Sequence, residues 1–374
     1  TKAGAAKRDE FIEVSDPEIS LKLNSSDEVH MTSIGGKGER DLYDVLRERQ
    51  SPGLVVFSSG SSGKSKATVH DVLPLLEKFK IRKRKLRMIS FLLFDHLGGI
   101  NTLLYALSNG GTIIIASDRS PESVLVAIDK HKVELLPTSP TFINLLLLSD
   151  SYKKHDLSSL RLVTYGTEPM PETTLKRFHQ LFPEIRLQQT YGLTELGVLR
   201  SQSKASDSLW VKIGGEGFQT RVVDGILHIK SESVMLGYLN APSPFTDDGW
   251  FDTNDTVTVD GEYLLIHGRK SEIINVGGEK VHPTEVESVI QEIDGVEEVT
   301  VSGEPNAIIG NIICATIRAS EDVDEAALIA QVKKHCSKRL QRFKVPMKVW
   351  ITTDSQHSER FKKQRKPVTA ADNS

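Results

Sequence analysis

Between residues 88 and 190 the chain alternates short apolar runs with longer segments whose apolar residues recur at helical spacing. The expected strands are Met88–Leu93, Gly111–Ala116, Val133–Leu136, Arg161–Tyr165 and Ile185–Thr190, and the expected helices are Asn101–Ser108, Pro121–His131, Pro140–Ser149 and Pro171–Phe182. A proline in the first turn of a helix is well tolerated, because its missing N–H would be unpaired there anyway. Strands that alternate with helices predict an α/β fold with a mostly parallel sheet between layers of helices.

The pattern changes after Gly197, and this change divides the chain into a large and a small part. Short strands joined by turns are expected at Gln219–Val223, Ile226–Lys230, Thr256–Val259 and Tyr263–His267. From about Ser271 a smaller α+β unit follows, with helices at Pro283–Glu292 and Asp324–Leu340 and strands at Glu298–Gly303 and Ile312–Ile317. We therefore expect a large N-terminal domain of layered α/β subdomains at residues 1–269 and a small, mobile α+β domain at residues 270–374.

The first part of the chain is less regular. Phe11–Val14 and Ile19–Leu23 are short apolar pieces that predict edge strands. Gly53–Phe57 predicts a buried strand that leads into a glycine-rich loop, and the apolar spacing of Val69–Phe79 predicts a helix after that loop.

Composition and charge exclude some classes of partner. The 374 residues are 38% hydrophobic and 26% charged with a net charge of -3, so nothing favours nucleic acid or an anionic membrane as partner. The longest apolar runs are too short to span a bilayer, and the charged start does not resemble a signal peptide. Two cysteines, Cys314 and Cys336, cannot build a disulfide framework, so we expect a reducing, cytoplasmic location.

The glycine-rich loop has the composition of a phosphate site. Its candidate binding residues are Ser58, Ser59, Gly60, Ser61, Ser62, Gly63, Lys64 and Lys66. Glycines let backbone N–H groups turn toward one centre, while hydroxyls and lysines add donors and positive charge. A strand before the loop and a helix after it would form a context that favours anion binding, because the N–H groups at the start of a helix point at the anion. Two alternatives stay open: a flexible connector, and the P-loop of an NTPase, which requires glycine where Ser58 stands.

Residues 189–195 read QTYGLTE and form a second motif. With the loop, this motif resembles the adenylate-forming superfamily of acyl-CoA synthetases, adenylation domains and luciferases, whose signature is YGxTE. The resemblance implies that Tyr191 packs near adenine, that Thr194 touches phosphate during catalysis and that Glu195 holds Mg²⁺, roles that suit these side chains. The nucleotide-binding residues it implies in this motif are Gln189, Thr190, Tyr191, Gly192 and Thr194. The alternative is a polar turn after a strand.

A third motif of the same family lies at residues 249–255, which read GWFDTND, followed by Gly268-Arg269. The resemblance implies that Asp255 accepts hydrogen bonds from both ribose hydroxyls and that Arg269 contacts the nucleotide. Asn254 stands where the family has glycine, and asparagine is the next best residue for a left-handed backbone.

Two more segments match the family in its usual order. Residues 165–169 resemble the segment that walls the adenine and acyl pockets, and the binding residues implied there are Gly166, Thr167 and Glu168. Residues 277–287 resemble a segment of the mobile C-terminal domain that faces the entering thiol, with Gly277 and Gly278 as its glycines.

The tail resembles the segment that carries the family's catalytic lysine. In residues 358–365, SERFKKQR, Lys362 falls in register with that lysine, which contacts the carboxylate and the α-phosphate during adenylation. Phe361 replaces the usual glycine and Lys363 replaces an apolar residue, so Lys363 is the second candidate. A solvated basic tail is the alternative. At the hinge, Ser271 stands where the family commonly has Asp or Lys.

The acid itself should bind near residues 94–99, FDHLGG, which resemble the family segment that gates the acyl pocket. We expect His96 to line the acid, and Asp95 to pair with an amine if the substrate is an amino acid. A loop histidine with satisfied hydrogen bonds is the alternative for His96. Ser139, Thr141 and the strand end at Tyr165 are expected to complete the wall.

Together the motifs predict ATP-dependent activation of a carboxylic acid to an acyl-adenylate, with release of pyrophosphate and then thioester formation with CoA. ATP or AMP, Mg²⁺ and CoA are the implied cofactors. A stand-alone adenylation enzyme that loads an amino or aryl acid onto a carrier protein, a non-catalytic nucleotide-binding relative and a P-loop NTPase remain as alternatives. Since the phosphate loop usually lies further along the chain, we expect roughly one N-terminal subdomain to be absent.

Overall fold

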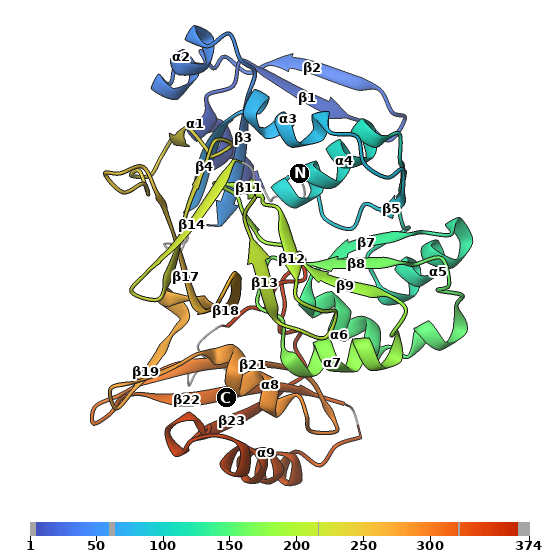
Figure 1. Ribbon diagram of the computed structural model, residues 1–374, viewed down its shortest axis with the longest axis vertical. Helices are drawn as coiled ribbons and strands as arrows, with labels where there is room; N and C mark the ends of the chain where they lie inside the picture. Colours follow the sequence, from blue (N-terminus) through green and yellow to red (C-terminus); the bar gives the residue numbers. More distant parts are fainter. Residues whose placement is uncertain (1–4, 60–63, 216, 321, 366–374) are drawn as a thin grey trace.

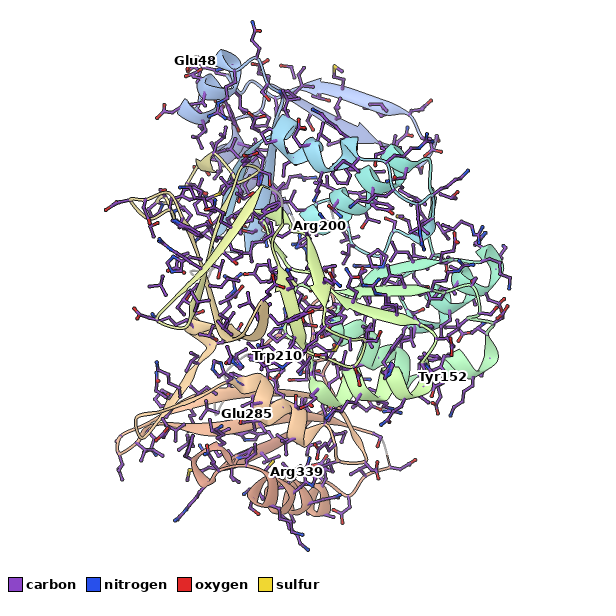
Figure 2. All side chains as sticks on the ribbon, in the orientation of Figure 1. Glu48, Tyr152, Arg200, Trp210, Glu285 and Arg339 are labelled. Carbon is purple, nitrogen blue, oxygen red and sulfur yellow. The ribbon has the colours of Figure 1, made fainter. Side chains whose placement is uncertain are left out.

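The structure is a computed structural model that describes residues 5–59, 64–215, 217–320 and 322–365. It shows a large N-terminal domain and a smaller C-terminal domain (Figure 1). Side chains of both domains meet between them, where Trp210 lies above and Glu285 below in the view of Figure 2. The predicted α/β class with two unequal domains is therefore confirmed. Among the described residues, no helix combines the length and the apolar character needed to cross a membrane.

A parallel sheet with strand order β6-β5-β7-β8-β9 forms one half of the N-terminal domain. Its strands are β5 (Arg87–Ile89), β6 (Thr112–Ile114), β7 (Leu135–Thr138), β8 (Leu162–Tyr165) and β9 (Arg186–Gln189). The helices between and after them are α4 (Leu97–Asn109), α5 (Pro121–His131), α6 (Pro140–Leu148), the 3₁₀ helix η1 (Ser151–Lys154) and α7 (Glu172–Leu181). The alternation predicted from the sequence is confirmed.

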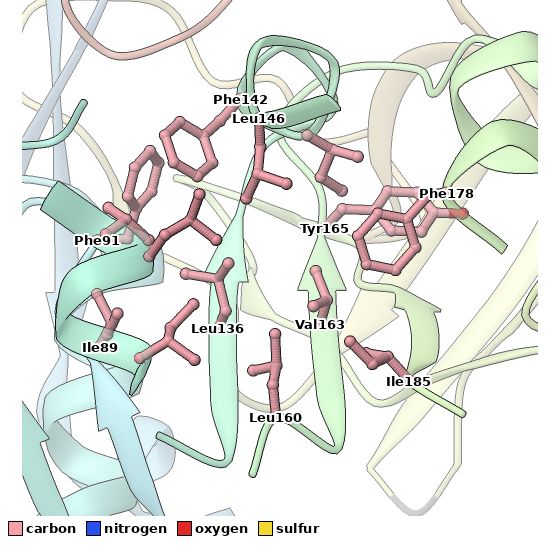
Figure 3. Packing of buried hydrophobic residues seen from close by; sticks show 14 of the residues in the cluster. Ile89, Phe91, Leu136, Phe142, Leu146, Leu160, Val163, Tyr165, Phe178 and Ile185 are labelled. Atoms are coloured by element: carbon pink, nitrogen blue, oxygen red, sulfur yellow. The ribbon is translucent and has the colours of Figure 1, made fainter. Parts of the chain in front are cut away.

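Local sequence explains where these helices begin. The Ser120 and Ser139 hydroxyls cap α5 and α6 by accepting the Ser123 and Phe142 N–H groups, and each helix has proline in its first turn. Phe142 and Leu136 belong to a buried apolar cluster that fixes the helices on the sheet (Figure 3). The carboxyl ends of β7, β8 and β9 therefore present their loops from a rigid base.

The other half of the N-terminal domain is antiparallel. A six-stranded sheet has the order β12-β13-β18-β17-β15-β14. Its strands are β12 (Ser201–Ser203), β13 (Trp210–Ile213), β14 (Phe218–Val223), β15 (Ile226–Ser231), β17 (Phe251–Asp260) and β18 (Tyr263–Arg269). Asp224 and Gly225 turn the chain between β14 and β15 with positive φ at both residues, as the sequence predicts. The small β10 (Gly192–Leu193) and β11 (Gly197–Val198) pair with each other.

The first segment of the chain corrects one expectation and confirms another. Phe11–Val14 is not a strand but part of α1 (Ala5–Ser15), which places Phe11 on the ring of Phe57 with 4.0 Å between ring centroids. Ile19–Leu23 is strand β1, as expected, paired with β2 (Val29–Ser33). Helix α2 (Asp41–Glu48) follows.

The glycine-rich loop joins two antiparallel strands, β3 (Gly53–Ser59) and β4 (Ser65–Asp71). The helix predicted at Val69–Phe79 was therefore wrong in its first part, since α3 (Val72–Lys80) begins only after β4, where the Asp71 side chain accepts the Leu73 N–H. Strand β16 (Gly237–Tyr238) pairs with the other edge of β4. Gly53–Phe57 is a strand, as expected, but the expected burial is only partial, because Val56 alone among these residues is buried.

The C-terminal domain packs helices on a mixed sheet. The sheet runs β20-β19-β22-β21, with β23 parallel to β22. Its elements are η2 (Lys270–Glu272), β19 (Ile274–Val276), β20 (Glu279–Val281), α8 (Pro283–Ile290), β21 (Val296–Asn306), β22 (Gly310–Ala319), α9 (Glu325–Arg339), η3 (Arg342–Lys344) and β23 (Lys348–Thr352). The predicted helices and strands of this domain are confirmed with shifted ends.

Candidate active site

Asp255 is the best-defined acceptor in the site. It lies on β17 and is only 6% exposed. It accepts a 2.6 Å hydrogen bond from the Tyr191 hydroxyl and forms a 3.0 Å ion pair with Arg269 Nε. Asn254 before it adopts φ +58°, the left-handed conformation expected where the family has glycine. The carboxylate of Asp255, which ends the motif at 249–255, is therefore bound both by Arg269 and by Tyr191 of the second motif.

The charges around Asp255 explain how it is kept as an acceptor. Burial raises the pKa of Asp255, while the adjacent Arg269 guanidinium and the Tyr191 hydroxyl favour the ionised form. Burial and the neighbouring carboxylate raise the pKa of Tyr191 well above its usual value, so its phenol donates a proton in the hydrogen bond. The hydroxyl of Tyr191 thus binds Asp255, whereas packing of its ring near adenine, which the family resemblance implies, stays a prediction.

Thr194 and Glu195 lie in the turn between β10 and β11. The Thr194 carbonyl accepts a 2.6 Å hydrogen bond from His70 Nε2, and Glu195 Oε1 accepts a 2.5 Å hydrogen bond from the Tyr238 hydroxyl. Lys66 Nζ lies 5.0 Å from the centre of the Tyr238 ring. Tyr238 therefore links the end of the glycine-rich loop to Glu195, so a phosphate held by the loop would lie near a hard oxygen ligand.

The loop itself is described only at its ends. Ser58 and Lys66 face each other across the β3–β4 pair, and Lys64 is exposed. Of Ser59 only the backbone is described, and Gly60, Ser61, Ser62 and Gly63 lie outside the described residues. Because a strand follows the loop instead of a helix, a helix dipole cannot assist phosphate binding, and that part of the sequence argument was wrong.

Asn240 fixes the end of the loop and was not found from the sequence. Its side-chain amide donates to the Ser65 carbonyl at 2.8 Å and accepts from the Ala67 N–H at 2.9 Å. His70, Tyr238 and Asn240 all contact motif residues from distant parts of the chain. No local pattern marks them, because their role exists only once β4 and β16 have paired.

The loops after β8 and β9 lie side by side. The Thr190 N–H donates to the Tyr165 carbonyl at 2.7 Å, and a Cβ on Gly166 would lie 2.7 Å from the Thr190 carbonyl oxygen, so only glycine fits there. Thr167 has φ +76°. Gln189, at the end of β9, is buried and its N–H donates to the Ser203 hydroxyl. The segment at 165–169, which the resemblance implies as a wall of the nucleotide pocket, thus lies next to the second motif.

Glu168 joins the two domains. Its Oε1 accepts from the Thr141 N–H at 2.8 Å and from the Thr141 hydroxyl at 2.5 Å, while Oε2 accepts from the Lys363 N–H at 2.8 Å. A carboxylate held on both oxygens has little acceptor capacity left in this conformation. Glu168 therefore holds the tail on the N-terminal domain here.

His96 caps α4, and its Nδ1 accepts the Gly98 N–H at 3.1 Å. Burial, together with the positive charges of Lys362 and Arg360, lowers the pKa of His96 to about 4. His96 is therefore a neutral imidazole near neutral pH. Asp95 is not a free partner for an amine in this conformation, because Arg360 Nη2 forms a 2.9 Å ion pair with it.

The two candidate lysines of the tail have different surroundings. Lys363 Nζ forms a 3.0 Å ion pair with Glu287, which is fully buried and also paired with Arg365 (2.8 Å). Within the described part of the chain, Lys362 forms no ion pair. Burial lowers the pKa of Lys362, opposed by the charge of Glu168 and assisted by Arg360 and Arg269. The charged amine of Lys362 thus interacts electrostatically with Glu168 and Arg269, and it affects the pKa of His96.

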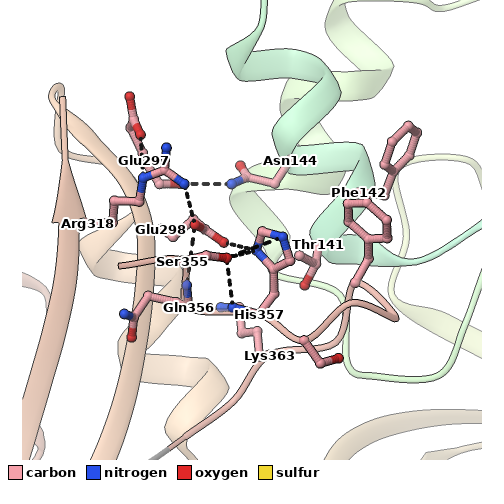
Figure 4. A network of polar contacts seen from close by, with 12 residues as sticks. Thr141, Phe142, Asn144, Glu297, Glu298, Arg318, Ser355, Gln356, His357 and Lys363 are labelled. Carbon is pink, nitrogen blue, oxygen red and sulfur yellow. Dashed lines mark hydrogen bonds and ion pairs between the residues drawn. The ribbon is translucent and has the colours of Figure 1, made fainter. Parts of the chain in front are cut away.

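The tail packs where the domains meet. The Ser139 hydroxyl donates to the Phe361 carbonyl at 2.7 Å, and the Asn144 amide donates to the Glu297 carbonyl at 2.9 Å. Figure 4 shows helix α6, with Thr141 and Asn144, facing this part of the C-terminal domain. Ser139 and Thr141, expected in the acyl wall, instead hold Phe361 and Glu168 in this conformation. The Tyr165 ring is 1% exposed and belongs to the apolar core.

Gly277 and Gly278 form the turn of the β19–β20 hairpin, with φ of +58° and +90°. Space around both is open enough for an added Cβ, so the backbone conformation and not crowding favours glycine. The Gly277 N–H donates to the Ile309 carbonyl at 2.7 Å in the same domain. In the described residues, no hydrogen bond joins this turn to Asp255 or Lys362.

Comparison with known proteins decides the family. A sequence model described as "AMP-binding enzyme" matches residues 6–239, and a second, described as "AMP-binding enzyme C-terminal domain", matches residues 285–362. The chain belongs to the AMP-binding enzyme family. The sequence-based resemblance to adenylate-forming enzymes is thereby confirmed.

Relatives of this AMP-binding chain include several CoA ligases. It is 28% identical to the indoleacetate–CoA ligase of Aromatoleum aromaticum over 80% of this chain and 63% of that protein. It is 29% identical to the long-chain-fatty-acid–CoA ligase FadD13 of Mycobacterium tuberculosis over 79% of this chain and 63% of that protein. The chain thus spans less than two thirds of these relatives.

A solved structure supports the fold. The crystal structure of the anthranilate CoA ligase AuaEII in complex with anthranoyl-AMP matches with a TM-score of 0.74 and 24% identity, covering 83% of this chain and 65% of that one. At this identity the likeness establishes the shared fold alone.

Proposed function

We propose that this chain activates a carboxylic acid with ATP and then transfers the acyl group to CoA as a thioester. The observation that carries the proposal is the position of Lys362. The tail of the C-terminal domain brings this amine into the field of Arg269, Glu168 and His96. The CoA ligases among its relatives point to the same chemistry.

The proposed first step is attack of the acid's carboxylate oxygen on the α-phosphorus of ATP. A new P–O bond forms while the bond to the bridging oxygen breaks and pyrophosphate leaves. Protonated Lys362 stabilises the negative charge between carboxylate and phosphate, and Lys66 with the loop 58–66 holds the departing phosphates. Asp255 positions the ribose hydroxyls, with Arg269 beside it.

Mg²⁺ fits the donors around Glu195. In proteins this ion is held by one or two carboxylates together with substrate phosphates and water, and one carboxylate beside a phosphate loop meets that description. Glu195 would hold the ion, and Tyr238 orients the carboxylate by donating to Oε1. Once bound, the ion would neutralise charge on the ATP phosphates.

The proposed second step requires the C-terminal domain to turn. The CoA thiol, as thiolate, attacks the acyl carbonyl carbon and AMP leaves with the bonding electron pair. Residues 277–287 would then face the thiol after rotation near Ser271, which lies in η2 between the last strand of the N-terminal domain and β19. This supports a domain boundary between residues 269 and 270.

The proposal includes a cytoplasmic location, because both cysteines are buried free thiols.

The direct test of the whole sequence of steps is product analysis. The protein is incubated with ATP, Mg²⁺ and a panel of aryl, fatty and amino acids, with CoA or with a phosphopantetheinylated carrier protein, and masses are measured. Acyl-CoA as product supports the proposal. An acyl-carrier product without acyl-CoA would replace CoA by a carrier protein, and AMP binding without any acyl product would point to a non-catalytic relative.

A further inference from the structure

We infer that Phe361, in place of the glycine that the family has before its lysine, acts as a latch that positions Lys362 in the site. The inference rests on the proposed function for its kinetic part. It goes beyond that function because it assigns a role to a residue at which this chain departs from the family pattern. The contacts of residues 356–364 carry the argument.

The tail forms a short antiparallel loop closed by its own hydrogen bonds. The Ser358 N–H donates to the Lys362 carbonyl at 2.9 Å, and the Gln364 N–H donates to the Gln356 carbonyl at 2.9 Å. Phe361 completes the turn with φ +54°. Glycine adopts this conformation freely, whereas a residue with a side chain is strained in it. The phenylalanine therefore carries a backbone cost that its ring contacts must offset.

The ring of Phe361 packs into the apolar core of the N-terminal domain. Its centroid lies 5.3 Å from that of Phe91 and 5.4 Å from that of Phe142. The Arg119 guanidinium lies 5.4 Å from the Phe361 centroid and donates to the Glu359 carbonyl at 2.8 Å. Aromatic and cation–π contacts of this kind favour the docked tail over the released one.

The ring of Phe361 also contacts the C-terminal domain. His357 stacks on Phe361 with centroids 5.3 Å apart and an angle of 16° between planes. His357 Nδ1 lies 2.5 Å from Glu298 Oε1, and Arg318 pairs with Glu298 at 3.2 Å (Figure 4). A continuous row of contacts thus runs from β21 and β22 through His357 and Phe361 into the N-terminal core.

This row fixes the residue that precedes Lys362, so it sets where the amine stands. In the proposed second step the tail must leave the site. The same contacts that favour adenylation should therefore slow the domain movement that leads from adenylation to thioester formation. Phe361 is a positioning residue in this account, and it acts on the reaction only through Lys362.

The test compares Phe361→Gly with Phe361→Tyr and with a matched aromatic control, Phe343→Ala. Phe343 packs against the C-terminal core, and among the described residues no ring contact, hydrogen bond or ion pair joins its side chain to residues 356–365. Glycine keeps the left-handed backbone and removes only the ring, whereas tyrosine keeps the ring. Acid-dependent ATP–pyrophosphate exchange measures adenylation, and CoA acylation from synthetic acyl-adenylate measures the second step. Hydrogen exchange of peptide 356–365 in the full chain measures docking without any substrate.

In Phe361→Gly we expect pyrophosphate exchange to fall about tenfold, the size expected from losing one partly buried ring. Acylation from the adenylate should stay equal or rise, the peptide should exchange faster, and Phe361→Tyr should restore wild-type values. Unchanged rates and unchanged hydrogen exchange would overturn the latch, as would an equal loss in both steps matched by Phe343→Ala. If wild type shows no acid-dependent exchange, the proposed function fails, and hydrogen exchange still decides whether the latch exists.

Discussion

At the scale of single residues, Lys362 and Lys363 show how adjacent side chains of the same type have different surroundings. Lys363 neutralises the buried Glu287, so removing it would leave a buried charge with one partner fewer. Burial lowers the pKa of Lys362, and the charge of Lys362 helps to lower the pKa of His96. The sequence could rank the two only by register with a family motif, whereas their surroundings now separate them.

Replacement of Lys362 by alanine should therefore strongly slow adenylation without unfolding the chain. We expect the acid-dependent exchange rate to fall by about 10²–10³-fold, the range for removing a group that stabilises transition-state charge. Lys363→Ala is the matched variant: it should keep most of the exchange activity and lose about 1.5–3 kcal/mol of stability, as for a hydrogen bond to a charged group. The reverse pattern in exchange and urea unfolding would make Lys363 the catalytic lysine.

The pH dependence of adenylation should report the same amine. In the proposed mechanism Lys362 acts as a cation, and burial lowers its pKa below the usual 10.5, so the rate should fall with rising pH earlier than for an ordinary lysine. His96, with a pKa of about 4, should add no inflection between pH 5.5 and 8. A rate profile of wild type against Lys362→Arg checks this, because arginine stays charged. An alkaline limb that persists in the arginine variant would assign it to another group.

At the scale of elements, the outcome of prediction depended on how local the deciding forces were. Helices α5 and α6 begin at a serine cap followed by proline, so their starts were readable from the sequence. Strand β4 was not, because its apolar residues also fit a helix and its state is decided by pairing with β3 and β16, which are distant in the chain. The same holds for Tyr238 and Asn240, whose contacts depend on that pairing.

Helix α8 is tied to the tail by one buried carboxylate, which predicts sensitivity to acid. Burial alone would raise the pKa of Glu287, but Lys363 and Arg365 lower it to about 2. A carboxyl group whose pKa is depressed on folding stabilises the protein above its ordinary pKa near 4.5, and this stabilisation is lost as pH falls from there toward 2. Chemical unfolding between pH 6 and 3 should therefore show a stability loss that is smaller in Glu287→Gln. Parallel losses in both proteins would refute the assignment.

At the scale of the whole molecule, the two domains meet through the tail. Glu168, Ser139 and Asp95 of the N-terminal domain bind Lys363, Phe361 and Arg360 of the tail. The sequence predicted the two domains and the motifs in each, because periodicity and motif order are local properties. It did not predict that residues expected in the acyl wall bind the tail, because that depends on the relative placement of the domains.

The central claim is that an acid is activated by ATP at this site, and acid-dependent ATP–pyrophosphate exchange measures that step alone. The full chain is mixed with ATP, Mg²⁺ and labelled pyrophosphate, with and without each carboxylic acid of a panel. The account predicts label in ATP only when a suitable acid is present. Absence of exchange with every acid, or ATP hydrolysis that proceeds at the same rate without any acid, would contradict it.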